Sequence, residues 1–167
     1  MKSDDPTTST RSRVIRVDVA GTAVFVIALV VAVPYRSHRF AQFLIGGVSM
    51  ALFAIGVAST LWAYARALER SRVEEVGVAN LYLLTGPTAP KAVRRTMTSA
   101  LATQIVAAVV GAWIGVVGLD TGELNALAFG VLVPMFGIGM NGVWAALHGW
   151  YGPRVGRAVS PPEHEID

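Results

Sequence analysis

The sequence contains no cysteine and few charged residues. Without cysteine the chain forms no disulfide, has no thiol nucleophile and offers no cysteine for a lipid anchor. Charged residues make up 15% of the 167 residues, against about 25% in an average soluble domain, while 53% are hydrophobic. This balance predicts a membrane protein.

Four long stretches carry almost no charged side chain, and their lengths match a lipid bilayer. A helix rises about 1.5 Å per residue, so about 20 apolar residues cross a hydrocarbon core of roughly 30 Å. The first stretch is the shortest, but Val14 and Ile15 extend it on the N-terminal side. The sequence therefore predicts an all-α membrane protein with transmembrane helices at about residues 14–35, 40–65, 97–119 and 124–147.

Basic residues lie almost entirely on one side of this four-span layout. With a cytoplasmic N-terminus, only Arg36 and Arg39 lie outside. The twelve basic residues on the inner side are Lys2, Arg11, Arg13, Arg16, Arg66, Arg70, Arg72, Lys91, Arg94, Arg95, Arg154 and Arg157. Positive residues concentrate on the cytoplasmic side of membrane proteins, so we expect both termini to be cytoplasmic. The same rule explains the net charge of +3 without a nucleic-acid partner. Arginine outnumbers lysine twelve to two, and alanine, valine and glycine are abundant, which suggests a GC-rich bacterial genome. We therefore expect the membrane to be a bacterial inner membrane.

The segments between the spans differ in length and character. Short turns join the first span to the second and the third to the fourth, which predicts two antiparallel hairpins. We expect residues 1–12 to form a cytoplasmic tail, residues 13–155 the bundle, and residues 156–167 a disordered cytoplasmic tail. A cytoplasmic connector, residues 66–96, joins the hairpins. Its apolar segment 78–84 is too short to span, and we expect it on the membrane surface or beneath the bundle.

The fourth span contains the stretch PMFGIGMNG, residues 134–142, with one proline, three glycines and one asparagine. Pro134 cannot bond to the carbonyl of Gly130, so we expect a continuous helix that is kinked near Gly130 and Pro134. At about 100° per residue, one stripe of this helix holds Gly130, Pro134, Gly137, Asn141 and His148. Away from this stripe we expect the lipid-facing residues Leu132, Met135, Phe136, Met140, Val143 and Leu147.

Small residues also form stripes on the second and third spans, where they allow helices to approach closely. The third span has Ala100, Gln104, Ala107, Gly111, Gly115 and Gly118. The second span has Gly47, Ala51, Ala54, Ala58 and Ala65. By depth, Gln104 and Asn141 come level in their antiparallel helices. The sequence therefore predicts an interhelical hydrogen bond between these two amides, of about 0.5–2 kcal/mol.

We expect most of the ionisable residues near the spans to have structural roles. Asp18 is the deepest acidic residue, and we expect it near the interface in a structural ion pair with a residue such as Arg66 or Arg95, with a transport carboxylate as the alternative. Asp120 and Glu123 have the spacing of a capping box before the fourth span. Lys91, Arg94 and Arg95 form a basic cluster that anchors the topology, with contact to anionic lipid as the alternative.

No residue pattern indicates catalysis, a cofactor or a metal. The histidines at positions 38, 148 and 164 are too widely separated for a local metal site. We also find no phosphate-binding loop, zinc-binding helix motif or catalytic serine motif. We therefore expect that the chain is not an enzyme and binds no cofactor.

Two functions remain open from the sequence. The stripes of small residues exceed what one bundle needs, and no ionisable group is expected deep in a span. These features favour a non-catalytic accessory, assembly or scaffold subunit, with the lipid bilayer and either a membrane-protein partner or a second copy as its contacts. The alternative is a small transporter or lipid-handling protein, in which Gln104, Asn141 and His148 line a polar path along the third and fourth spans.

Overall fold

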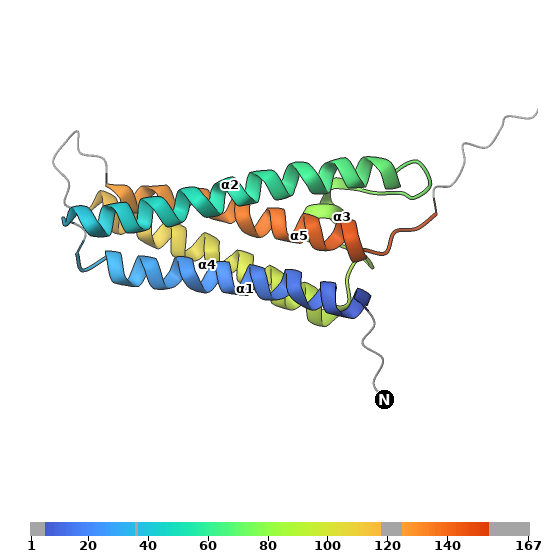
Figure 1. Ribbon diagram of the computed structural model, residues 1–167, viewed down its shortest axis with the longest axis horizontal. Helices are drawn as coiled ribbons and strands as arrows, with labels where there is room; N and C mark the ends of the chain where they lie inside the picture. The colour runs from blue at the N-terminus through green and yellow to red at the C-terminus, as the bar shows by residue number, and fades with distance from the viewer. Residues whose placement is uncertain (1–5, 36, 118–124, 154–167) are drawn as a thin grey trace, which may run out of the picture.

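The computed structural model of the chain describes residues 6–35, 37–117 and 125–153 (Figure 1). Its elements in order are α1 (Pro6–Ala32), α2 (Arg39–Arg70), α3 (Val78–Leu83), α4 (Lys91–Val116), the 3₁₀ helix η1 (Ala126–Leu132) and α5 (Pro134–His148). Four segments are long and apolar enough to cross a membrane: Arg13–Ala32, Arg39–Arg70, Lys91–Val116 and Ala126–His148. The prediction of an all-helical chain with four such segments is confirmed, and no strand occurs within the described ranges.

The long segments lie side by side in one elongated bundle (Figure 1). α1 and α4 run in one direction, and α2 and α5 run in the other. The start of α1, the end of α2, α3 and the end of α5 all lie at the right-hand end of Figure 1. α5 contacts α1, α2, α3 and α4, and its most extensive contact is with α2. α5 is therefore the central helix of the bundle.

Glycines allow α2 and α5 to touch through their backbones. A Cβ atom on Gly56 would lie 2.5 Å from the backbone nitrogen of Phe136, and a Cβ atom on Gly139 would lie 2.5 Å from the carbonyl oxygen of Gly56. Both distances are below any normal contact, so only glycine fits at these two positions. Within a membrane, helices associate through close packing of this kind because lipid is as apolar as the side chains.

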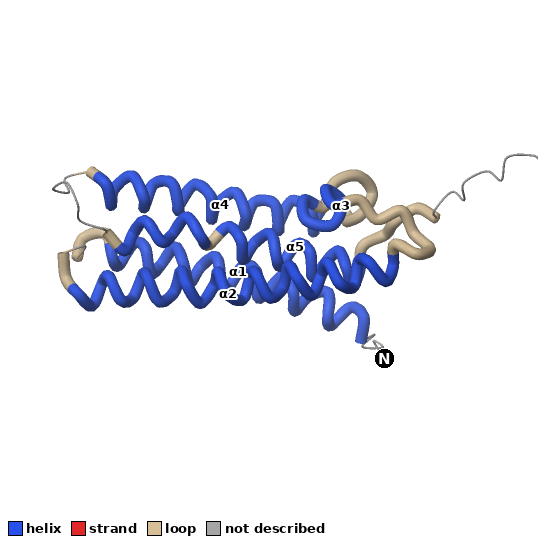
Figure 2. Tube along the Cα trace, turned by 90° about the horizontal axis from the view of Figure 1, so that it is seen from above, coloured by secondary structure: helices blue, strands red, loops and turns tan. Residues whose placement is uncertain are grey.

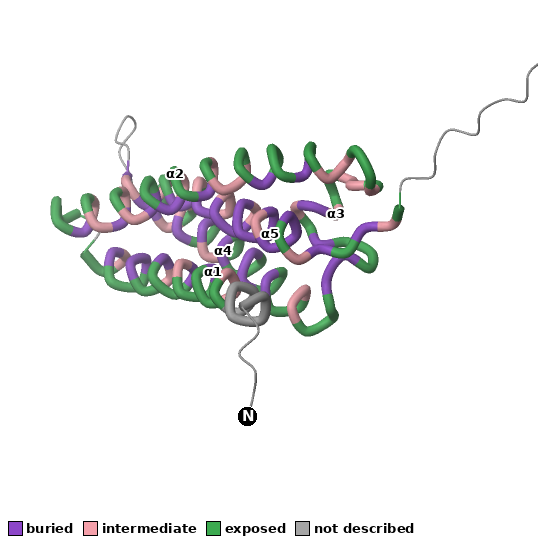
Figure 3. The backbone as a smooth tube through the Cα atoms, turned by 45° about the vertical axis from the view of Figure 1, so that its right-hand side comes forward, coloured by how far each residue is buried: buried purple, intermediate pink, exposed green. Residues whose placement is uncertain are grey.

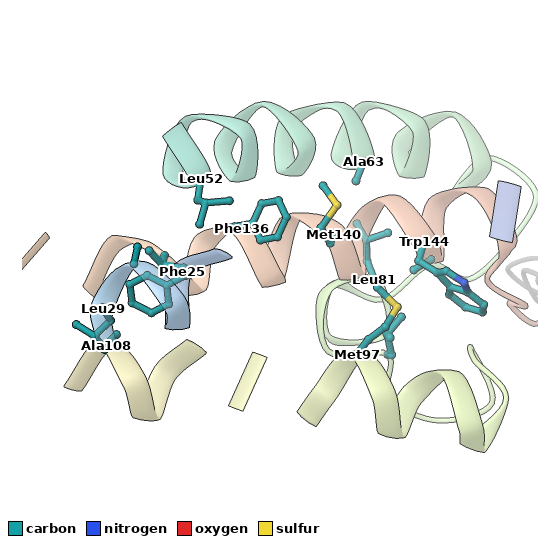
Figure 4. Close-up of a cluster of buried hydrophobic side chains, with 14 of the residues drawn as sticks. Phe25, Leu29, Leu52, Ala63, Leu81, Met97, Ala108, Phe136, Met140 and Trp144 are labelled. Carbon is teal, nitrogen blue, oxygen red and sulfur yellow. The ribbon is translucent and has the colours of Figure 1, made fainter. Parts of the chain in front are cut away.

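The buried side chains form a continuous apolar core around α5 (Figure 4). Phe136, Met140 and Trp144 of α5 belong to this core, with exposed fractions of 1%, 6% and 0%. The ring of Phe136 lies against Gly21 of α1, where a Cβ atom would clash with it. The prediction that Phe136 and Met140 face lipid is therefore wrong. α5 is covered on several sides, so its apolar residues away from the predicted stripe also become core residues.

The small residues predicted as a packing face of α2 lie on its outer side. Gly47, Ala51, Ala54, Ala58 and Ala65 are all exposed, and no atom lies within 4 Å of a Cβ position on Gly47. The buried face of α2 consists of Ala41, Ile45, Ser49, Leu52, Gly56, Ala63 and Ala67. Figure 3 shows this division between the buried and exposed sides of α2. Among the described residues, the predicted stripe therefore lies outside the buried face of α2.

The fourth span is divided into two elements. Val133 separates η1 from α5, and Pro134 occupies the first turn of α5, which suits a residue without an N–H group (Figure 2). The side chain of Asn125 accepts a hydrogen bond of 3.0 Å from the N–H of Leu127 and so caps η1. The expected continuous helix of residues 124–147 is thus replaced by a 3₁₀ helix and an α-helix. The kink near Gly130 stays a prediction.

The apolar connector segment packs against the bundle. α3 contacts α5, and Leu81 and Leu84 are buried. The hydroxyl of Tyr82 donates a hydrogen bond of 3.1 Å to the carbonyl of Thr60 in α2. Burial and the nearby Tyr64 raise the pKa of Tyr82, which keeps this donor protonated. The segment therefore packs against the bundle, which is one of the two positions expected from the sequence.

Arg70, the last residue of α2, caps the end of α5. Its guanidinium donates to the carbonyls of Ala146 at 3.1 Å and Gly149 at 2.9 Å, and it forms an ion pair with Glu74 at 2.8 Å. The carbonyls at the end of a helix lack partners within the helix, so these bonds satisfy them. The same guanidinium lies 4.8 Å from the ring centroid of Tyr151, whose pKa burial raises to about 12.

Gly56→Ala is expected to destabilise the folded chain, whereas Gly47→Ala is not. The new methyl group at position 56 meets the α5 backbone, which cannot move aside, and such overpacking costs about 1–3 kcal/mol. At position 47 the methyl group enters open space, where alanine favours a helix by up to about 1 kcal/mol. Thermal unfolding in mild detergent, followed by circular dichroism, measures both variants. Equal stability of the two variants would contradict the close contact between α2 and α5.

Candidate functional site

A polar cluster occupies the middle of the bundle. Thr22, Gln104 and Gly137 lie close to the midpoints of the spans Arg13–Ala32, Lys91–Val116 and Ala126–His148. The amide nitrogen of Gln104 donates to the hydroxyl of Thr22 at 2.7 Å, and the backbone N–H of Gly137 donates to the amide oxygen of Gln104 at 3.1 Å. Gln104 is 0% exposed and therefore joins α1, α4 and α5 from within.

The break in the fourth span explains why Gln104 is needed. The first N–H groups of a helix have no partner within the helix, and α5 begins inside the bundle rather than at its surface. An unsatisfied N–H group at membrane depth costs several kcal/mol. Gln104 supplies the missing acceptor for Gly137. A Cβ atom on Gly137 would lie 2.6 Å from the amide oxygen of Gln104, so glycine is required for this approach.

Asp18 lies next to this cluster, one helical turn before Thr22. The hydroxyl of Thr22 donates to the backbone carbonyl of Asp18 at 2.8 Å. The Asp18 side chain is 0% exposed, and neither carboxylate oxygen has a hydrogen-bond partner of ordinary geometry.

The expected ion pair of Asp18 with Arg66 or Arg95 is wrong. Arg66 pairs with Glu69 on its own helix, and Arg95 is exposed. Helix α1 begins at Pro6, well before the apolar part of the span. Asp18 is therefore enclosed by neighbouring helices and does not lie at a helix end near the basic residues.

The predicted hydrogen bond between Gln104 and Asn141 is also wrong. The amide nitrogen of Asn141 donates to the backbone carbonyl of Tyr82 at 3.0 Å, and its amide oxygen is buried without a partner. Both amides point into the bundle, as their faces predicted. Asn141 meets α3 there instead of α4, because the connector packs against this part of α5. The two amides thus satisfy different partners.

The remaining residues of the predicted seam lie along the packing surfaces of α4, η1 and α5. Gly111, Gly115 and Gly130 are buried, and Cβ atoms on them would lie 2.7 Å from Leu29, 3.1 Å from Leu127 and 3.2 Å from Phe25. The ring of His148 lies 5.7 Å from that of Trp144, at the end of α5 away from the polar cluster.

The predicted basic cluster lies at the start of α4. Lys91 and Arg95 are exposed, whereas Arg94 is partly buried and donates to the carbonyl of Gly86 at 3.2 Å. The predicted capping residues Asp120 and Glu123 lie outside the described residues, as do Gly118 and both predicted tails apart from the backbone of residues 6–12. Among the described residues, no three His, Cys, Asp or Glu side chains gather as a metal site would require.

A groove of about 440 Å³ opens between α1 and α4 beside the polar cluster. Its walls are formed by Val19, Thr22, Ala23, Val26, Thr96, Ser99, Ala100 and Thr103. The hydroxyls of Thr96, Ser99 and Thr103 all donate to carbonyls of their own helix, one turn back. Thr22 belongs both to the groove wall and to the buried cluster. The groove therefore reaches Thr22 at the edge of the polar cluster, while Gln104 and Asp18 do not line it.

Sequence reasoning missed Asp18 and Thr22 as parts of one interior site. Both lie on the face of α1 that also buries Phe25 and Leu29. Asp18, Thr22, Phe25 and Leu29 follow one another at intervals of four, three and four residues, which places them on one side of a helix. This shared face could therefore be recognised in the sequence. The groups that contact Asp18 and Thr22 could not be predicted, because the sequence of α1 reveals neither the interruption of the fourth span nor the helices that pack around that interruption.

Comparisons with known protein families, with curated proteins and with solved structures found no match for this chain.

Gln104→Met is expected to destabilise the bundle because it keeps the length of the side chain but removes its amide. The N–H of Gly137 loses its acceptor, and one unsatisfied buried group costs about 1–3 kcal/mol. Thr103→Ala, at the neighbouring exposed position, serves as the control and should leave the unfolding temperature almost unchanged. Thermal unfolding in detergent compares the two variants. An unchanged unfolding temperature for Gln104→Met would rule out its role as the cap of α5.

Proposed function

We propose that the protein is a non-catalytic accessory, assembly or scaffold subunit of a larger membrane complex. The exposed stripe of Gly47, Ala51, Ala54, Ala58 and Ala65 carries this proposal. It lies on the side of α2 opposite the face that packs inside the bundle. Stripes of small residues are typical of helix interfaces in membranes, and this one is exposed in the part of the chain that the structure describes. A transmembrane helix of a partner protein, or of a second copy, is the proposed occupant.

We further propose that the chain lies in a bacterial inner membrane with both termini in the cytoplasm. The asymmetric distribution of basic residues supports this orientation. In this arrangement the spans form two antiparallel hairpins, the fourth span is kinked near Gly130 and Pro134, and the connector with α3 faces the cytoplasm. Lys91, Arg94 and Arg95 then lie at headgroup depth, where contact with anionic lipid adds to their role as a topology anchor.

A small transporter or lipid-handling protein is the second candidate, and one observation favours it. The buried Asp18 carboxyl lies one helical turn from the bonds that join Thr22, Gln104 and Gly137 near the start of α5. Transporters often place ionisable groups and the ends of broken helices at the membrane centre. The groove between α1 and α4 provides a path from the surface of the bundle to this cluster. We expected no ionisable group this deep in the bundle, so its position strengthens this alternative.

A single cysteine at the α2 stripe is expected to form cross-links to a neighbouring protein in native membranes. The chain has no cysteine of its own, so Ala54→Cys carries a unique thiol for a bifunctional reagent. Val109→Cys is the matched control, since Val109 is also exposed but lies on α4. Adducts of defined size should form only from position 54, and mass spectrometry then distinguishes a partner from a second copy. Monomeric protein from both variants would overturn the accessory-subunit proposal.

Two further cysteine variants test the orientation. Ser37→Cys lies in the turn between α1 and α2, and Val73→Cys lies after the end of α2; both positions are exposed. In intact cells, a membrane-impermeant maleimide should label position 37 but should reach position 73 only after the membrane is opened. The reverse pattern would show that the termini face outward.

A further inference from the structure

Asp18 differs from every other acidic side chain that the structure describes. Glu69 and Glu75 are exposed, and Glu74 pairs with Arg70, whereas Asp18 is fully buried. Its two carboxylate oxygens have no hydrogen-bond partner, although Thr22 and Gln104 bond to each other one turn away. A buried carboxyl group without partners is rare in proteins and, within a membrane, generally marks a functional site.

Among the residues that the structure describes, no basic side chain bonds to the Asp18 carboxyl group. On α2, Arg66 pairs with Glu69, and Arg70 binds Glu74 and the end of α5. On α4, Lys91 and Arg95 are exposed, and Arg94 binds the carbonyl of Gly86. On α1 itself, Arg13 and Arg16 are exposed, and on α5 the ring of His148 lies beside Trp144. An isolated buried carboxylate is costly, so this group needs a positive ligand.

The surrounding groups favour a proton over a metal ion as that ligand. Calcium and magnesium require about six or more oxygen ligands, and the Asp18 carboxyl group supplies only two. The other side-chain oxygens of the cluster are already engaged. The hydroxyl of Thr22 accepts a hydrogen bond from Gln104, and the amide oxygen of Gln104 accepts one from Gly137. A proton needs a single oxygen, which Asp18 provides.

We propose that Asp18 is a proton-binding site in the interior of the bundle and that its proton exchanges through the groove between α1 and α4. The groove runs along α4 from Thr96, near the start of the helix, to Thr103 at its middle, and its wall includes Thr22. Its hydroxyl groups provide positions at which water can be hydrogen-bonded. The inference holds whether or not the chain binds a partner protein. If the chain is a transporter, as in the second candidate function, this inference identifies the proton as its coupling ion.

An apolar carbodiimide tests the protonated carboxyl group directly. The acid gives its proton to a carbodiimide nitrogen while its oxygen bonds to the central carbon, and the resulting O-acylisourea rearranges to a stable N-acylurea. The full chain in mild detergent is treated with dicyclohexylcarbodiimide, digested and analysed by mass spectrometry. The peptide containing Asp18 should gain one carbodiimide, with less modification as the pH rises. A water-soluble carbodiimide should instead modify the exposed Glu75.

Asp18→Asn is the matched variant, because an asparagine resembles a neutral aspartic acid in shape. It should lose the modification and keep the unfolding temperature of the unaltered protein. A strongly lowered unfolding temperature would show that a charged carboxylate holds the fold together, and this result would overturn the proposal. Unmodified Asp18 in the folded, unaltered chain at mildly acidic pH would overturn it as well.

The exchange route is tested by filling the groove. Ser99→Leu places a large side chain in its wall and should slow the modification of Asp18 severalfold. Thr98→Leu is the control, because Thr98 is exposed but does not line the groove. Equal rates in the two variants would overturn the groove as the route.

Proton flux separates this inference from the second candidate function. Liposomes that contain the unaltered chain or Asp18→Asn are given a pH gradient, and internal pH is followed with a trapped dye. Flux that Asp18→Asn abolishes supports both the site and the transporter. Modification of Asp18 without any flux supports the proton site and overturns the transporter.

Discussion

The backbone of a membrane helix cannot be interrupted inside the bilayer unless another group satisfies the N–H groups that the interruption exposes. The fourth span is interrupted at Val133 and Pro134, and the amide of Gln104 provides the acceptor for Gly137. This bond determines several other contacts between helices in the interior of the bundle. It fixes the height of α4 against α5, and the other end of the same amide binds Thr22 of α1. Asp18 lies one turn from that contact.

Close packing then decides which helix is central. Gly56 and Gly139 bring the backbones of α2 and α5 together, so α5 makes its most extensive contact with α2. In a soluble protein the central helix would be recognised by its apolar surface. In a membrane every helix is apolar, so small residues carry this information instead. The same reasoning identifies the outer stripe of α2 as a surface that stays exposed in the part of the chain that the structure describes.

The four spans could be predicted because a charge-free length of about 20 residues is a direct physical requirement of the bilayer. The inward face of α4 could also be predicted, since Gln104, Gly111 and Gly115 repeat at helical spacing and all are buried. Phe136 and Met140 could not be placed, because an apolar side chain suits lipid and core equally well. Asn141 was predicted on the correct face with the wrong partner, since the position of α3 depends on contacts distant in sequence. Asp18 escaped prediction because depth along α1 does not reveal which helices surround it.

The two halves of the fourth span are held by different means. α5 is bonded at its start by Gln104 of α4 and at its end by Arg70 of α2, so side chains from two other helices fix both of its ends. Among the described residues, the start of η1 is capped by Asn125, and 3₁₀ hydrogen bonds have poorer geometry than those of an α-helix. Under mechanical load or changes in bilayer thickness, the segment before Pro134 should therefore deform more easily than α5, because side chains of other helices hold both ends of α5.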